Sequence, residues 1–251
     1  MNASGRWLPL TLIGALWAVQ AQAQTADEIV EKTLAAMGGR GSLAKLENRI
    51  ATGSVAISTE AADLAGPLVI YLKAPNKSRT LMKLDLSQFG AAEMVIDQRC
   101  DGKTAVASNS LQGDREITGS QLQNMLNARF PTPLLNYRDA GARVELVGKE
   151  KIGSRDALVL LFPPKAGPAS RLFVDAETWL LLRAVVRVES PELGGEVEQT
   201  TDMSDYRDVD GVKVPFAIAA VNPAQRISIT LTKVEHNQPI DESMFSRPAV
   251  K

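Results

Sequence analysis

The chain has 251 residues, with 28 basic and 29 acidic side chains, a formal net charge of −1 and one cysteine. Binding to nucleic acid needs a concentration of cations that a chain with this charge balance lacks, so we expect no nucleic-acid partner. The single thiol, Cys100, cannot form an internal disulfide, and we interpret it as a small buried apolar residue rather than a reactive group.

Residues 1–23 have the order of a cleavable secretory signal. Arg6 precedes an apolar run over residues 7–19, and Ala21 and Ala23 occupy positions −3 and −1 of a cleavage site. We therefore expect cleavage after Ala23 and an exported mature chain.

The apolar run is shorter than the roughly 20 residues that a membrane-spanning helix needs. A retained anchor helix is the alternative, but Pro9 interrupts the run. We therefore expect residues 24–251 to form one domain without a membrane span. Since Arg6 leaves with the leader, that domain has 27 basic and 29 acidic residues.

The mature chain begins with a helix pattern. Thr25 and Glu28 have the spacing of a capping box, and Gly38 and Gly39 end the pattern. A short second helical turn follows at residues 42–46. The apolar residues expected on one face of the first helix are Ile29, Val30, Leu34 and Met37.

After residue 48 the pattern changes to short strands separated by turns, without βαβ alternation or a linker. Residues 120–129 are the exception, because their apolar residues have helical spacing. We expect about ten or eleven antiparallel strands and two or three helices. The segments with a strand pattern are 49–58, 68–72, 79–86, 94–96, 104–107, 144–147, 157–162, 171–174, 179–188, 196–206, 212–221 and 226–234.

Two of these segments, 157–162 and 179–188, are apolar on both faces. Such strands need cover on both sides. Helices packed on the sheet would supply it, and so would an apolar cavity that holds a ligand; the pattern is compatible with both.

The residues for common catalytic sites are largely missing. His236 is the only histidine, and no Gly-x-Ser-x-Gly sequence presents a serine to it. One histidine and one cysteine are too few for a zinc site, and the phosphate-binding glycine motifs are absent. We therefore expect that the protein is not an enzyme and that it binds no metal or cofactor. Four aspartates lack calcium-loop spacing, and we interpret them as a solvated turn: Asp202, Asp205, Asp208 and Asp210.

Several motifs, in order, resemble the LolA/LolB-like superfamily of periplasmic lipoprotein carriers. Leu72-Lys73-Ala74-Pro75-Asn76 precedes a turn at Asp101-Gly102-Lys103, as in that family. Leu172-Phe173-Val174-Asp175 with Thr178, the segment 205–215 and the closing segment 237–248 extend the resemblance over most of the mature chain.

The resemblance implies a mostly β, α+β fold: an unclosed antiparallel β-barrel around an apolar cavity, with short helices as a lid. It implies a periplasmic, non-enzymatic carrier of lipid or lipoprotein acyl chains, with membrane proteins as possible partners. Ala74 stands where the carriers have a latching arginine, and Val106 where an aromatic residue often follows the turn. The alternatives are an adaptor module of the cell envelope with a filled barrel, and a hydrolase that uses His236.

If a cavity exists, its walls should come from inward strand faces and the helical lid. The candidate wall residues are Ile29, Leu34, Leu68, Ile70, Leu84, Leu86, Val95, Leu122, Met125, Leu126, Val159, Leu161, Leu180, Leu182, Val186, Ile227 and Ile229.

Overall fold

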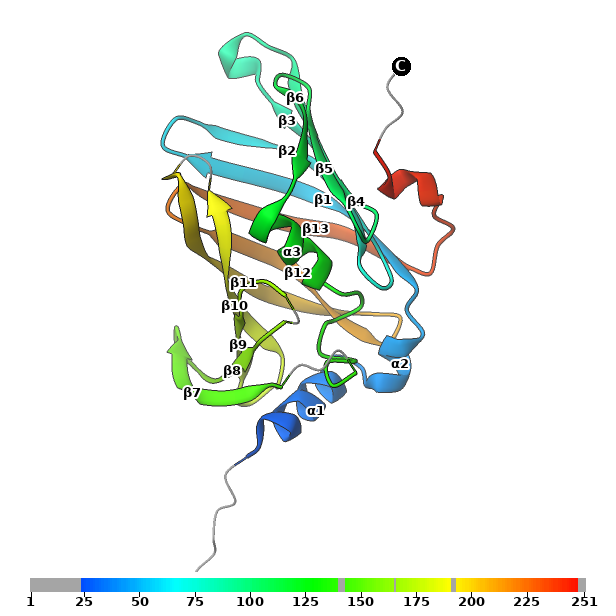
Figure 1. Ribbon diagram of the computed structural model, residues 1–251, viewed down its shortest axis with the longest axis vertical. Helices are drawn as coiled ribbons and strands as arrows, with labels where there is room; N and C mark the ends of the chain where they lie inside the picture. The colour runs from blue at the N-terminus through cyan, green and yellow to red at the C-terminus, as the bar shows by residue number, and fades with distance from the viewer. Residues whose placement is uncertain (1–23, 140–142, 165, 191–192, 248–251) are drawn as a thin grey trace, which may run out of the picture.

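One antiparallel sheet runs through the whole described chain in the computed structural model (Figure 1). The structure describes residues 24–139, 143–164, 166–190 and 193–247, so the expected leader at 1–23 lies outside the described residues. Within them the sheet has 13 strands in the order β6-β5-β4-β3-β2-β1-β13-β12-β11-β10-β9-β8-β7.

The strand bounds are β1 Asn48–Thr59, β2 Asp63–Lys73, β3 Lys77–Asp85, β4 Glu93–Cys100, β5 Ala105–Asn109, β6 Gly113–Ile117, β7 Glu145–Ile152, β8 Arg155–Phe162, β9 Ser170–Asp175, β10 Leu181–Ser190, β11 Gly195–Val209, β12 Val212–Val221 and β13 Gln225–His236.

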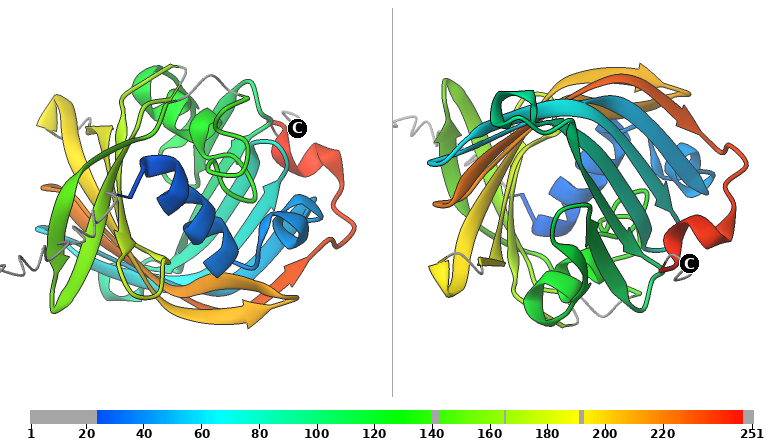
Figure 2. Two further views of the ribbon diagram at one scale, coloured as in Figure 1. Left: turned by 90° about the horizontal axis from the view of Figure 1, so that it is seen from below. Right: turned by 90° about the horizontal axis from the view of Figure 1, so that it is seen from above.

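Almost every strand pairs with its neighbour in the chain, and the first strand pairs with the last. β1 lies between β2 and β13, so the two ends of the chain meet in the middle of the sheet. The free edges are β6 and β7, which follow one another in sequence. The sheet curves into a half-open barrel and leaves a gap between these edges (Figure 2). The expected half-open antiparallel barrel is confirmed.

The strand count exceeds the expected ten or eleven, because each of the twelve segments named from the sequence forms a strand and β6 is added to them. β6 was not predicted, because four of its five residues are exposed and it has no apolar alternation. β2 begins at Asp63, earlier than the expected residue 68. Gly66 lies where β2 approaches β3 so closely that a Cβ would be 1.8 Å from the Lys83 carbonyl oxygen. Glycine is therefore required inside this strand.

The three helices lie near the predicted positions. α1 spans Ala26–Ala36, and its capping box is confirmed: the Thr25 hydroxyl accepts from the Glu28 amide at 3.2 Å, and the Glu28 carboxylate accepts from the Thr25 amide at 3.1 Å. α2 spans Arg40–Ala44, slightly before the expected turn, and α3 spans Gly119–Asn127.

The helices occupy the concave side of the sheet, with α1 inside the curve (Figure 2). A short 3₁₀ segment, η3 (Glu242–Phe245), packs against β3 and β4. Its Phe245 is buried, and Glu242 forms ion pairs with Lys73 and Lys77. No helix among the described residues is long and apolar enough to cross a bilayer.

Candidate ligand-binding site

The strand register defines which side chains line the concave face. Leu72 of β2 packs in the same cluster as the α1 residues Ile29 and Leu34, so it faces inward. Residues two apart along a strand share a face, and register partners share it across strands. By this rule Leu68 and Ile70 also face inward, as do their partners on β1, β3 and β13.

One cluster on this face is built from strand residues alone, and we call it the open patch. It comes from β1–β4 and β13, and no residue of a helix belongs to it. Its members are Val55, Ile57, Leu64, Leu68, Ile70, Met82, Leu84, Met94, Ile96, Ile227 and Ile229.

The open patch is only partly covered. Val55, Leu68 and Leu84 are 0–1% exposed, whereas the other eight members are only partly buried. Partly exposed aliphatic side chains grouped on one concave surface are typical of a binding site for an apolar ligand.

The other half of the interior is filled by the chain itself, and we call it the filled half. There α1, α2 and the segment 130–137 pack on the inner faces of β8, β9 and β12. Ile29, Val30, Leu34, Leu134 and Leu160 are all fully buried in this cluster.

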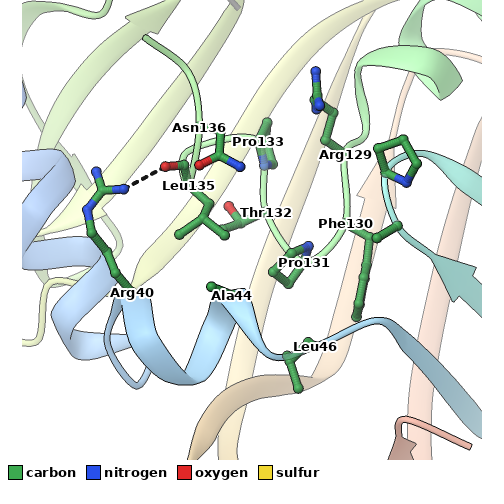
Figure 3. Close-up of a pocket in the computed structure, with 12 residues that line it drawn as sticks. Arg40, Ala44, Leu46, Arg129, Phe130, Pro131, Thr132, Pro133, Leu135 and Asn136 are labelled. Atoms are coloured by element: carbon green, nitrogen blue, oxygen red, sulfur yellow. Dashed lines mark hydrogen bonds between the residues drawn. The ribbon is translucent and has the colours of Figure 1, made fainter. Parts of the chain in front are cut away.

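An arginine on α2 binds the segment 130–137, which packs in the filled half (Figure 3). Arg40 donates to the Leu135 carbonyl oxygen at 2.6 Å and forms a two-bond ion pair with Glu31 of α1. The Tyr137 hydroxyl also donates to Asp27 of α1, and burial raises the pKa of Tyr137 to about 12. These contacts hold 130–137 against α1.

A pocket of about 320 Å³ lies between α2 and this segment (Figure 3), and Ala74 is among the residues that line it. The Ala74 side chain is exposed and is too short to contact the segment 130–137 across the pocket. Arg40, from a different element, makes the bond to the segment instead.

A chain of three polar side chains lies at the base of β1 and β13. Arg49 Nε donates to His236 Nε2 at 3.0 Å, and His236 Nδ1 lies 3.1 Å from an Asp210 carboxylate oxygen. Burial lowers the pKa of Arg49 to about 10, and Arg49 also stacks over the Phe130 ring. Burial, with Arg49 adding to it, lowers the pKa of His236 below 6.5. Both ring nitrogens of His236 are therefore engaged by Arg49 and Asp210.

The four aspartates of the acidic run pair with separate basic residues. Asp202 contacts Arg183, Asp205 contacts Arg207, and Asp208 contacts Lys213, while Asp210 contacts His236. In the parts of the chain that the structure describes, no group of His, Cys, Asp and Glu side chains has the arrangement of a metal site.

Many of the predicted wall residues come together on the concave face. The open patch contains Leu68, Ile70, Leu84, Ile227 and Ile229. Three others, from α3, pack over Cys100, Ala105 and Ile117 on β4–β6: Leu122, Met125 and Leu126. Cys100 itself is fully buried there, and burial raises the pKa of its thiol.

Ile29 and Leu34 lie in the filled half, so they are core rather than wall. Val186 shares the concave face with Ala184, which packs against the same half. Leu86 is buried just beyond the end of β3, and Leu180 lies just before β10.

Four predicted wall residues face the opposite side of the sheet. Val159 and Leu182 belong to a separate cluster with Ala157, Phe173 and Val185, on the face away from α1. Alternation places Leu161 on that face of β8 as well. Val95 lies between Met94 and Ile96 on β4, so it also points away from the open patch. These four are therefore not part of the candidate site.

The sequence reasoning missed five members of the open patch that are partly exposed. They are Ile57, Leu64, Met82, Met94 and Ile96. Alternation with residues already chosen on the same strands was the available signal for Met82, since Leu84 shares its face.

Neither the protein-family models nor the curated proteins contain a match to this sequence. Solved structures do match. A LolA superfamily protein from Nitrosomonas europaea has a TM-score of 0.57 and 13% identity, over 90% of this chain and 99% of that one. A putative outer membrane lipoprotein-sorting protein domain from Vibrio parahaemolyticus has a TM-score of 0.55 and 13% identity, over 87% and 95%.

A DUF1329 family protein from Desulfovibrio piger is similar to the same degree, with a TM-score of 0.56 and 13% identity over 88% of this chain and 97% of that one. Together these comparisons establish that the chain has a LolA-like fold.

Proposed function

We propose that the protein is a periplasmic carrier that binds the acyl chain of a lipid or lipoprotein on the open patch, without turnover. The observation that carries this proposal is the open patch itself. Eight aliphatic or thioether side chains are partly exposed on a concave surface, in a molecule whose other interior half is densely filled. The LolA-like fold supports the same function.

The energetics of such binding are favourable. Burial of a 16-carbon chain at roughly 0.8 kcal/mol per methylene offers on the order of 10 kcal/mol before losses. Lost translational freedom and ordering of the chain reduce this figure substantially. Contacts with aliphatic side chains such as Ile70 and Ile229 suffice, so no catalytic group is required.

The test is displacement of a fluorescent fatty acid. Ile227→Gln places a polar group on the open patch, and we expect a loss of affinity of about tenfold or more. Its matched control is Ser228→Gln, the next residue of β13, which is exposed on the other face. Equal affinity in the two variants would contradict the proposal.

Two further substitutions distinguish a residue of the helical lid from a core residue on the opposite face of the sheet. Met125→Ala trims α3, which packs over β4–β6, and should weaken dye binding. Leu182→Ala trims the cluster on the opposite face and should lower stability without a change in dye affinity. Large destabilisation in both, with unchanged dye affinity, would favour the adaptor alternative.

The filled half is the observation that favours an adaptor module, because a packed interior needs no ligand. Mass spectrometry of organic extracts from natively purified protein distinguishes the two functions. The carrier should retain lipid above background, and absence of that lipid would favour the adaptor.

The expected cleavage after Ala23 has its own test. N-terminal sequencing of the exported protein should give a sequence that begins at Gln24.

A hydrolase would need His236 as its base. Its ring nitrogens contact Arg49 and Asp210, and neither contact is with a serine or cysteine. If purified protein hydrolyses an ester, we expect that activity to be unchanged in His236→Ala. Its loss would support the hydrolase alternative.

A further inference from the structure

A second, polar cavity lies across the mouth of the half-barrel. It has a volume of about 490 Å³ and lies between the inner faces of β4–β6 and the opposite wall, made by the end of β10 and the β12–β13 turn. This volume lies within the roughly 300–1,000 Å³ usual for small-molecule sites. Residues from both walls therefore contribute to one pocket.

The polar cavity is continuous with the open patch. Ile96 of β4 belongs to both, and Gln98 follows it on the same inner face. On the other wall Gln225 precedes Ile227 by two residues on β13, so they share a face too. One amphiphile could therefore contact the apolar and the polar surface together.

The polar side chains of this cavity have unused hydrogen-bonding groups. The side chains of Gln98 and Gln225 line it, and neither of them forms a hydrogen bond with another described residue. Side-chain amides both donate and accept hydrogen bonds. They are available to a ligand that does the same.

The charges in the cavity offset one another. Arg115 and Glu189 both line it, and Arg115 donates to Gln121 of α3 at 3.3 Å. An anionic head group would meet the Glu189 carboxylate and the amide oxygens as well as the guanidinium. A neutral group with several hydroxyls can pair with all of them.

We propose that this polar cavity binds the uncharged, hydroxyl-bearing head group of an amphiphile whose acyl chain lies on the open patch. The inference rests on the proposed function and specifies its ligand class. The head group lies between Gln98 and Gln225, and the chain runs from Ile96 over the open patch.

The experiment compares three probes with the same chain: monopalmitoylglycerol, palmitate and palmitoyl lysophosphatidylglycerol. Wild-type protein should bind the neutral monopalmitoylglycerol most tightly. Gln98→Leu and Gln225→Leu should each weaken that probe about five- to tenfold and change palmitate affinity less than about twofold. Gln88→Leu, in the exposed turn η1 (Ser87–Phe89), is a control outside the cavity, and the Gln88 amide donates to the Asp63 carbonyl oxygen.

Each other result has a defined meaning. Equal affinity for the three probes, tighter binding of either anion, or equal weakening of all probes by Gln98→Leu would overturn this inference and leave the carrier function standing. A palmitoylated peptide serves as a fourth probe. If it binds more tightly than monopalmitoylglycerol, the cavity binds polypeptide, and this inference is overturned as well. Failure of every probe to bind the wild type would overturn the carrier function too. Urea midpoints of the variants show whether they are folded.

Discussion

The filled half and the open patch have the same inward-facing aliphatic chemistry but different cover. In the filled half, α1 and residues 130–137 lie on the strands and exclude water. On the open patch, strand residues have only one another as neighbours within the cluster. The difference teaches that the sheet provides an apolar inner surface in both of these regions. The segments that pack on it determine where a ligand can bind.

The largest difference should appear on truncation of a side chain in each half. Leu34→Ala, in the filled half, removes a fully buried side chain and should lower the free energy of unfolding by about 2–5 kcal/mol, because it leaves a cavity. Leu64→Ala, on the open patch, should cost at most about 1.5 kcal/mol and weaken acyl-chain binding. Urea denaturation and dye displacement measure the two effects. Similar destabilisation in both variants would break the comparison.

Arg49 is the next test, because its buried guanidinium contacts Phe130 of the filled half. Arg49→Leu leaves His236 Nε2 without its hydrogen-bond donor and should cost about 1–3 kcal/mol. His236→Leu in the same protein removes the orphaned acceptor, so the double variant should lose less than the sum of the single losses. Strict additivity in a double-mutant cycle would show that the two side chains act independently.

The cap of α1 should have a smaller effect that is confined to the filled half. Thr25→Ala removes the side-chain acceptor of the capping box and should lower stability by about 1 kcal/mol. Thr25→Asn retains an acceptor and is the control. Dye affinity should be the same in both variants, and a parallel loss of affinity would mean that α1 also shapes the open patch.

The smallest expected effect is a pH dependence from His236. Its pKa is lowered in the folded protein, chiefly by burial, so the unfolded chain takes up the proton first as pH falls below 6.5. Stability should therefore be full above the unfolded pKa and decline as pH falls through it toward the folded pKa. Urea midpoints at about pH 5.5 and about pH 7.5 measure this difference, which should shrink in His236→Gln. An unchanged difference in that variant would assign the slope to other groups.

The local signals of this sequence were sufficient to predict α1 and the strand-rich architecture, whereas the half-open barrel was implied by the resemblance of its motifs to the LolA/LolB-like superfamily. Thr25 and Glu28 specify a cap by spacing alone. β6 escaped prediction because Gly113-Asp114-Arg115-Glu116 has no apolar alternation, and its pairing with β5 supplies the stability.

The candidate site was less predictable, because alternation cannot say which face is concave. Val159 and Leu182 look like wall residues by pattern, yet they pack together on the face away from α1. Strands that are apolar on both sides give no local signal for inside and outside. Ile96 and Gln98 acquire their importance only from the opposite wall, which lies far away in sequence.

The pairing of β1 with β13 has a consequence for when the molecule can acquire its shape. Arg49 and His236 face each other across this pair, although 187 residues separate them. A chain without β13 would leave β1 and β12 as open edges in the middle of the sheet. Contacts at such long separation form late and slowly. The hollow that we propose for the ligand therefore forms only after β13 has been synthesised, since β13 joins its two walls.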